Sequence, residues 1–155
     1  MTMSITLSSQ NLYDQDYYLW IETTIEKIKQ GSFSTVDWEK VLEELEGMGR
    51  SEKRAVESFL TRILEHLLKL HYWECQKDYN ANHWKAEITT FRFQLSKYLS
   101  DSPSLKRYLE QIFGECYGAA LRSVSRAMGV KLGSLPEEAI ATLEQALDDE
   151  WFPKQ

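Results

Sequence analysis

The chain has 155 residues, of which 43% are hydrophobic and 27% are charged, and its formal net charge is -6. This composition is typical of a folded globular protein and excludes an intrinsically disordered one. The length predicts a single domain, and the lack of an apolar run of roughly 18 residues argues against a membrane-spanning segment. The N-terminal residues show neither the basic start nor the apolar run of a secretory signal, so we expect a cytoplasmic protein.

The pattern of residues predicts an all-α fold. Only three prolines and seven glycines interrupt the chain, and no useful stretch alternates apolar and polar residues as a strand does. We expect a flexible N-terminal arm over residues 1–11 and a single-domain helical bundle of about five to six helices over residues 12–155. The first helix is predicted over residues 14–30, with Gly31 as its C-terminal stop.

Residues 36–73 are expected to form two helices that are separated at Gly49. A glycine can adopt the left-handed conformation that ends a helix, so a break is predicted there. In the second of these helices His66 lies on the apolar side, about 20° around the helix from Phe59 and about 60° from Ile63. The first carries an apolar stripe that we expect to face the core: Trp38, Val41, Leu42, Leu45 and Met48.

Three more helices are predicted after a polar, turn-like segment at residues 75–82. They cover residues 83–100, 103–128 and 134–147. Pro103 is a favourable first residue for the second of them, and Ser134 with Glu137 forms a capping box for the third. Arg92 is expected at the edge of an apolar stripe, where it would either extend to water or pair with the central glutamates.

The segment from residue 43 to residue 66 has two interpretations. In the functional one, Glu43, Glu44, Glu46 and Glu52 form a polar pocket with His66 for a metal ion or a proton relay. In the structural one, the glutamates form a solvated face that is paired with neighbouring bases, and His66 is hydrogen-bonded inside the core.

Three missing patterns favour the structural interpretation. The chain contains no Glu-x-x-His, which marks di-iron carboxylate bundles. It contains no His-Glu-x-x-His. His66 and His71 lie about 140° apart on a helix, so they cannot bind one ion from one face. We therefore expect no metal site and no cofactor, and no catalytic residue is established.

The cysteines and the distribution of charge narrow the remaining classes of function. Cys75 and Cys116 are not spaced as a redox pair, and we expect two free thiols. Residues 137–150 contain six acids and no base, whereas residues 85–131 contain eight bases and four acids. A basic segment inside an acidic protein usually complements its own acidic parts, so we do not expect nucleic-acid binding.

Several short motifs together resemble a known bacterial family. They are Tyr13-Asp14-x-Asp16 with Trp20; Gly31 and Phe33; Glu43-Glu44-Leu45-Glu46-x-Met48-Gly49 with Ser51-Glu52; His66-Leu67-Leu68-Lys69; Trp84 with Ile88 and Arg92; Ser102-Pro103-Ser104-Leu105; and Phe152-Pro153. With them the chain is similar, over nearly its whole length, to the family called domain of unknown function 29, which is abundant in cyanobacteria. The chain departs from the family's usual pattern after Lys69 and at Leu135-Pro136-Glu137. The resemblance implies an all-helical bundle and brings no established activity.

The family motifs place carboxylates, an arginine and a histidine in the stretch that the residue spacing also singles out. The resulting candidate polar cluster consists of Glu44, Glu46, Glu52, His66 and Arg92. Such a cluster is either a buried network that fixes the register of the helices or a functional site, and both interpretations remain open.

The sequence favours a protein-protein interaction or oligomerisation module without catalytic activity. Amphipathic helices, a small-residue patch at Gly118 to Ala120 and a wholly acidic C-terminal helix suited to a basic partner support this hypothesis. The alternative is a metal-assisted hydrolase or ribonuclease-like enzyme. It would use Glu44 and Glu46 as metal ligands or bases and His66 as an acid or base.

Overall fold

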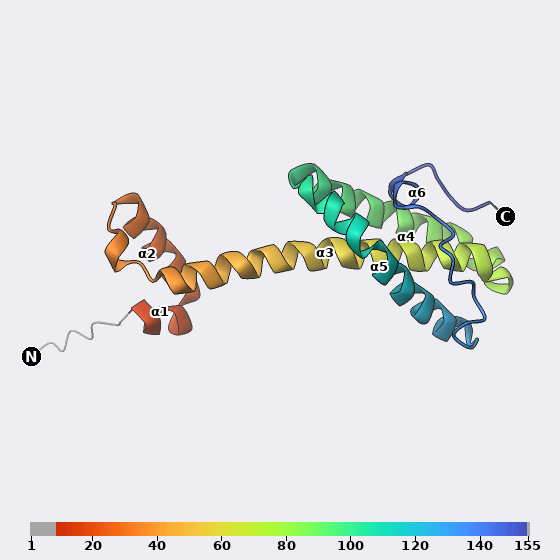
Figure 1. The fold of residues 1–155 in the computed structure, drawn as a ribbon, viewed down its shortest axis with the longest axis horizontal. Helices are drawn as coiled ribbons and strands as arrows, with labels where there is room; N and C mark the ends of the chain where they lie inside the picture. The colour runs from red at the N-terminus through yellow and green to blue at the C-terminus, as the bar shows by residue number, and fades with distance from the viewer. Residues whose placement is uncertain (1–8, 155) are drawn as a thin grey trace, which may run out of the picture. The chain divides into compact units, whose positions relative to one another are not determined.

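A computed structural model describes residues 9–154, and this part of the chain is all-α, as the sequence predicts, with no strand. Its elements are α1 (Ser9–Gln15), α2 (Tyr17–Lys29), the 3₁₀ turn η1 (Phe33–Thr35), α3 (Trp38–Tyr72), α4 (Glu74–Asp101), α5 (Ser104–Met128) and α6 (Leu143–Leu147) (Figure 1).

The chain divides into two compact units, residues 1–49 and residues 50–155. The division falls within α3, whose first third belongs to the first unit. Compactness alone does not show that a unit folds by itself, so the single domain expected over residues 12–155 stays a prediction. Of the expected N-terminal arm, residues 1–8 lie outside the described residues, whereas the chain is helical from Ser9.

The first unit packs α1 and α2 against the start of α3. The single helix predicted over residues 14–30 is divided at Asp16, whose carboxylate accepts a hydrogen bond of 3.0 Å from the Leu19 N–H and so caps α2. Gly31 has a φ of 75° and follows the end of α2, as predicted. Trp20 is buried and contacts the Tyr13 ring edge-on, with 4.9 Å between the ring centroids.

The predicted break at Gly49 is wrong, because α3 runs through it as one helix of 35 residues. Gly49 does not adopt a positive φ, unlike Gly31 and Gly129. A glycine inside a helix costs about 0.5–1 kcal/mol relative to alanine. Because that cost is small, α3 accommodates both Gly49 and Gly47, which lies two residues before it.

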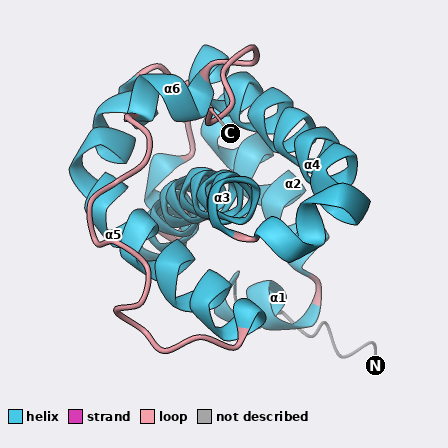
Figure 2. Cartoon of the chain, turned by 90° about the vertical axis from the view of Figure 1, so that its right-hand side faces the viewer, coloured by secondary structure: helices cyan, strands magenta, loops and turns pink. Residues whose placement is uncertain are grey.

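The second unit is a bundle of α4, α5 and the C-terminal two thirds of α3. Figure 2 shows α4 and α5 on either side of this part of α3, with α6 at the rim. Phe59 of α3 meets Phe91 of α4, with 6.3 Å between ring centroids, and Tyr108 of α5 donates a 3.2 Å hydrogen bond to Glu57 of α3. The fully buried residues that α3 contributes to the core recur at helical spacing: Val56, Leu60, Ile63, Leu64, Leu67 and Leu68.

Helix α4 begins nine residues earlier than expected, so residues 75–82 are helical rather than turn-like. This segment contains neither glycine nor proline, and local pairs support its first turns. Lys77 forms an ion pair of 2.7 Å with Glu74. Trp73 stacks on Trp84 with 5.9 Å between ring centroids, which holds the start of α4 against its own third turn.

The helix predicted over residues 134–147 is reduced to α6, Leu143–Leu147, and its cap is Thr142 rather than Ser134. Tertiary contacts override the capping signal. Leu135 and Ala141 are both buried, and the Tyr117 hydroxyl donates a 3.0 Å hydrogen bond to the Glu138 carbonyl oxygen. The acidic residues 137–150 therefore do not share one helix, and the expected acidic C-terminal helix is wrong.

Candidate functional site

The five residues of the predicted polar cluster have separate surroundings. Glu44 and Glu46 belong to the first unit, and Glu52, His66 and Arg92 to the second. Within residues 9–154 no hydrogen bond or ion pair joins any two of the five. Glu46 and Glu52 are exposed side chains of α3. A functional role for each residue stays a prediction, and each has to be judged from its own contacts.

Glu44 holds α1 and α2 onto α3. Its two carboxylate oxygens accept hydrogen bonds from the hydroxyls of Tyr13 and Tyr17, the second at 2.6 Å. These bonds lower the pKa of Glu44 and raise the pKa of Tyr13 to about 12. The Lys40 ammonium lies 5.0 Å from the centroid of the Tyr13 ring. Both oxygens of Glu44 are thus engaged in joining helices, which is a structural task.

His66 lines an open groove of about 430 Å³ between α3 and α4. Its Nδ1 lies 2.8 Å from the Arg62 carbonyl oxygen, so Nδ1 carries the proton and donates it. Burial lowers the pKa of His66 and so favours the neutral ring. The ring also meets Phe91 edge-on, with 5.6 Å between centroids.

The groove offers no ligand set for a metal ion. Glu65 and Glu87 line it together with His66. Among the described residues, however, no group of three or more His, Cys, Asp or Glu side chains is arranged to hold an ion. The enzyme alternative, in which Glu44 and Glu46 would be metal ligands beside His66, gains no support from this geometry.

Arg92 neither extends to water nor pairs with a glutamate. Its side chain is 2% exposed and donates to three backbone carbonyls of the C-terminal segment: Ala146 at 2.8 Å, Gln145 at 3.1 Å and Asp149 at 3.4 Å. Its guanidinium lies 5.1 Å from the centroid of the Phe152 ring. Burial lowers its pKa, although Asp149 and Asp148 oppose that effect. Arg92 therefore fixes the C-terminal segment against α4.

Four of the five residues in the apolar stripe at the start of α3, which was predicted to face the core, are exposed, and Val41 is half-buried. The exposed fraction is 48% for Trp38, 57% for Leu42, 59% for Leu45 and 63% for Met48. We call these four residues the apolar face. Glu44, which accepts the Tyr13 and Tyr17 bonds, lies about 100° around α3 from Leu45 but about 40° from Met48. Helices α1 and α2 therefore lie on another side of α3 from Leu42 and Leu45, and Met48 is the residue of the face nearest to them.

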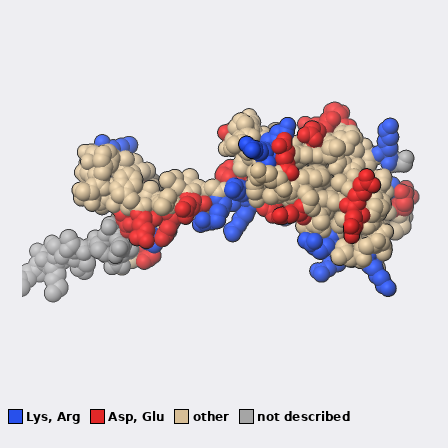
Figure 3. Space-filling model, in the orientation of Figure 1, with Lys and Arg blue, Asp and Glu red and all other residues tan. Residues whose placement is uncertain are grey.

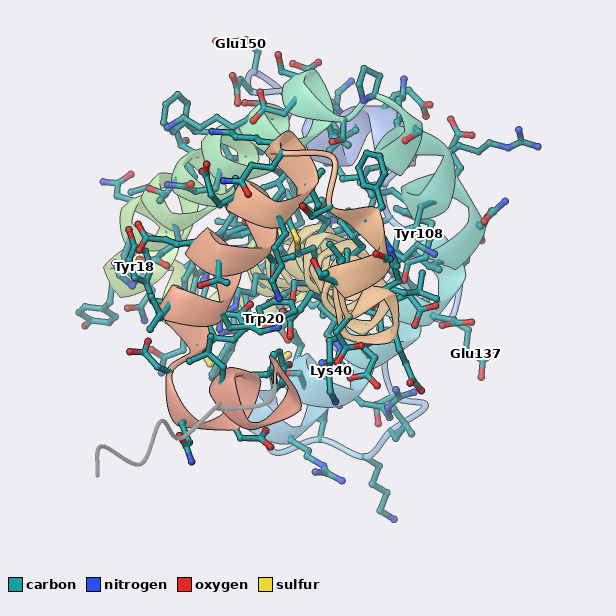
Figure 4. The ribbon with its side chains drawn as sticks, turned by 90° about the vertical axis from the view of Figure 1, so that its left-hand side faces the viewer. Tyr18, Trp20, Lys40, Tyr108, Glu137 and Glu150 are labelled. Atoms are coloured by element: carbon teal, nitrogen blue, oxygen red, sulfur yellow. The ribbon has the colours of Figure 1, made fainter. Side chains whose placement is uncertain are left out.

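Other apolar side chains of the first unit are exposed as well. Figure 4 shows the Trp20 side chain pointing into the protein and the Tyr18 side chain pointing outward. Of the thirteen exposed large apolar side chains among the described residues, nine lie between residues 17 and 48. Besides the apolar face they are Tyr17, Tyr18, Leu19, Ile25 and Phe33.

Acidic side chains accompany this apolar surface. Glu46 and Glu39 lie about 40° and 60° around α3 from Leu42, along one border of the apolar face. Residues 1–49 contain nine acids and three bases, a net charge of -6, whereas residues 50–155 contain fifteen of each. Figure 3 shows acidic side chains gathered beside uncharged surface on the first unit.

Comparison with known families decides the classification. The family described as Domain of unknown function DUF29 matches residues 12–152. The chain belongs to this family. No curated protein and no solved structure matches the chain. The description of the DUF29 family contains no activity, so the function has to be argued from the structure.

The motifs that carry the DUF29 resemblance have structural roles here. Tyr13 bonds to Glu44, Asp16 caps α2, and Arg92 meets Phe152. The motif residues Leu45 and Met48, in contrast, have no such role, because they lie on the apolar face. Sequence periodicity found this stripe correctly and misjudged only whether the chain covers it.

The two ends of the small-residue patch in this DUF29 protein have different surroundings: Ala120 is fully buried in the core, whereas Gly118 faces a cleft. Gly118 lines a cleft of about 280 Å³ whose other side consists of Leu132, Gly133 and Leu135. An irregular segment therefore lies opposite Gly118. No helix in residues 9–154 combines the length and the apolar character that crossing a bilayer requires.

Proposed function

We propose that this DUF29 chain is a protein-protein interaction module without catalytic activity, and that its docking surface is the apolar face of α3. The observation that carries the proposal is the exposure of Trp38, Leu42, Leu45 and Met48, each between 48% and 63%. Contiguous apolar surface of this kind on a folded protein is typical of an interaction site. Tryptophan and methionine are also among the residues that are enriched in such sites.

The first unit has little core of its own, which supports the same proposal. Among its described residues only Trp20, Thr24 and Val36 are buried. Segments near 40 residues in length rarely bury enough apolar surface to be stable without a further element. Complete burial of a large apolar side chain contributes about 1.5–3 kcal/mol. Because the side chains of the apolar face are already about half covered, a partner would gain roughly 1 kcal/mol from each.

Affinity capture with matched variants tests the proposal. The tagged chain, a Leu42→Ser, Leu45→Ser variant and a Phe93→Ser control would be expressed in the cells that encode the protein. Phe93 is 56% exposed but lies on α4 in the second unit. We expect a stoichiometric protein that the unaltered chain and the Phe93 control retain and the double variant loses. Equal retention by all three, with the double variant folded by circular dichroism, would contradict the proposal.

A further inference from the structure

The composition of the first unit indicates which kind of partner fits the apolar face. We infer that the occupant is a basic amphipathic helix of another protein, with lysine or arginine beside its own apolar stripe, rather than a second copy of this chain. This inference rests on the proposed docking function and adds the chemistry of the partner. Three observations support it: the shape of the face, the charges at its border and the charge of the whole unit.

The face has the dimensions of a helix contact. Its residues recur at spacings of three and four along one helix, from Trp38 to Met48. At 1.5 Å per residue this stripe is about 15 Å long, and its four positions span about 120° around the helix. A stripe of this spacing is the seam into which the apolar residues of a second helix pack. A helix of the same length therefore covers the face with fewer gaps than a flat surface would.

Between Trp38 and Met48 one border of the face is acidic, and Arg50 follows one turn beyond Glu46. Glu39 and Glu46 follow one side of the stripe, about 60° and 40° from Leu42. The one lysine in this part of α3, Lys40, is already paired with Glu43 at 3.1 Å and lies over the Tyr13 ring. A partner helix thus meets carboxylates beside the apolar contact. Cations at its flanking positions give complementary charges, which set the choice and orientation of paired helices.

The charge of the whole unit argues against the other occupants. A second copy would bring a first unit of charge -6 against another of the same charge, and like charges at a contact disfavour association. The same repulsion disfavours nucleic acid and anionic lipid headgroups. A basic protein helix is the occupant that both the apolar stripe and its acidic border favour.

Binding of three designed peptides to the full-length chain tests the inference. Each peptide is a labelled helix of about 20 residues with the same leucine stripe, and the flanking positions carry lysine, glutamine or glutamate. Fluorescence anisotropy would give each dissociation constant at low and at high salt. We expect the lysine peptide to bind at least about tenfold more tightly than the glutamate peptide, and to lose most of that advantage at about 1 M salt.

Two charge variants locate the effect. In a Glu39→Gln, Glu46→Gln chain the preference for the lysine peptide should fall severalfold. In a Glu110→Gln, Glu115→Gln control, which removes the same charge from exposed positions of α5, the preference should stay. An equal loss in both variants would overturn the inference, because the effect would then arise from net charge rather than from the border of the face.

The remaining outcomes separate failure of this inference from failure of the docking function. Equal binding of all three peptides, abolished by Leu45→Ser, would overturn the basic partner and leave the docking surface intact. Light scattering that showed a dimer abolished by Leu45→Ser would likewise overturn it in favour of a second copy. Co-sedimentation with phosphatidylcholine vesicles, or no binding of any peptide, would also overturn it. The capture experiment with the Leu42 and Leu45 variant tests the docking function independently.

Discussion

Replacement of Arg92 by methionine should detach the C-terminal segment from α4. Methionine retains much of the apolar stem and removes the guanidinium, which donates to the carbonyls of Ala146, Gln145 and Asp149. A hydrogen bond to a charged group contributes about 1.5–3 kcal/mol, and an acceptor that is left buried costs about 1–3 kcal/mol. The guanidinium itself pays a desolvation cost that methionine does not, so the three losses are partly offset.

We expect a net loss of about 2–4 kcal/mol in the free energy of unfolding for Arg92→Met. Arg92→Lys should lose about 1–2 kcal/mol, because an ammonium retains the charge but cannot reach three carbonyls as a planar fork does. Urea unfolding followed by circular dichroism gives these values. Lys97→Met is the matched control, because Lys97 is exposed on the same helix.

Hydrogen exchange identifies which segment loses stability in Arg92→Met. In Arg92→Met the amides of residues 143–149 should exchange faster, while those of α3 change little outside global unfolding. A destabilisation of Arg92→Met that stays within about 0.5 kcal/mol, the range of ordinary surface substitutions, would refute the role of Arg92 in holding the C-terminal segment.

Three further predictions follow from local geometry. Gly49→Ala should stabilise the chain by about 0.5–1 kcal/mol, because α3 is continuous there and a Cβ at Gly49 meets nothing within 4 Å. The control Gly31→Ala, at a φ of 75°, should destabilise the chain by about 1–2 kcal/mol. A loss of stability in Gly49→Ala would contradict a continuous α3. The Tyr13 phenol should titrate near pH 12 rather than 10 by carbon NMR, and Glu44→Gln should bring its pKa back toward 10; an unchanged titration in that variant would contradict the hydrogen bond. Since burial lowers the pKa of His66 below its ordinary value of 6.5, its contribution to stability should be complete above pH 6.5 and decline as the pH falls below it. The urea midpoint of the unaltered chain should therefore drop more between pH 7 and pH 5 than that of His66→Gln, and equal drops would show that the folded chain does not disfavour the charged ring.

Local sequence signals correctly predicted those features of the fold that depend on backbone conformation and on apolar spacing within one helix. Gly31 ends α2 because glycine adopts a positive φ at little cost, and the apolar spacing of residues 56–70 marks the buried side of α3. Gly49 and the Ser134 cap carry equally good local signals, yet neither acts as predicted. At Ser134 contacts that are distant in the sequence decide the outcome, whereas at Gly49 the cost of a helical glycine is too small to break α3.

The candidate site could be predicted only in part, for the same reason. The composition of α4 places Arg92 near an apolar stripe, but its hydrogen-bond partners lie 53 to 57 residues away and are backbone carbonyls, which no sequence pattern marks. The stripe from Trp38 to Met48 is recognisable as one side of a helix. Whether the chain or a partner covers that side depends on the position of α1 and α2, which periodicity does not contain.

Site-specific photocrosslinking at Leu45 tests the central claim most directly. A photoreactive amino acid would replace Leu45 in one chain and exposed Lys97 in a control, each expressed in the cells that encode the protein. If the apolar face is a docking surface, irradiation should join position 45, and not position 97, to a basic helical segment of another protein, which mass spectrometry of the crosslinked peptide identifies. A crosslink from position 45 to residues of the same chain would show that the chain covers its own apolar face, and would contradict the account.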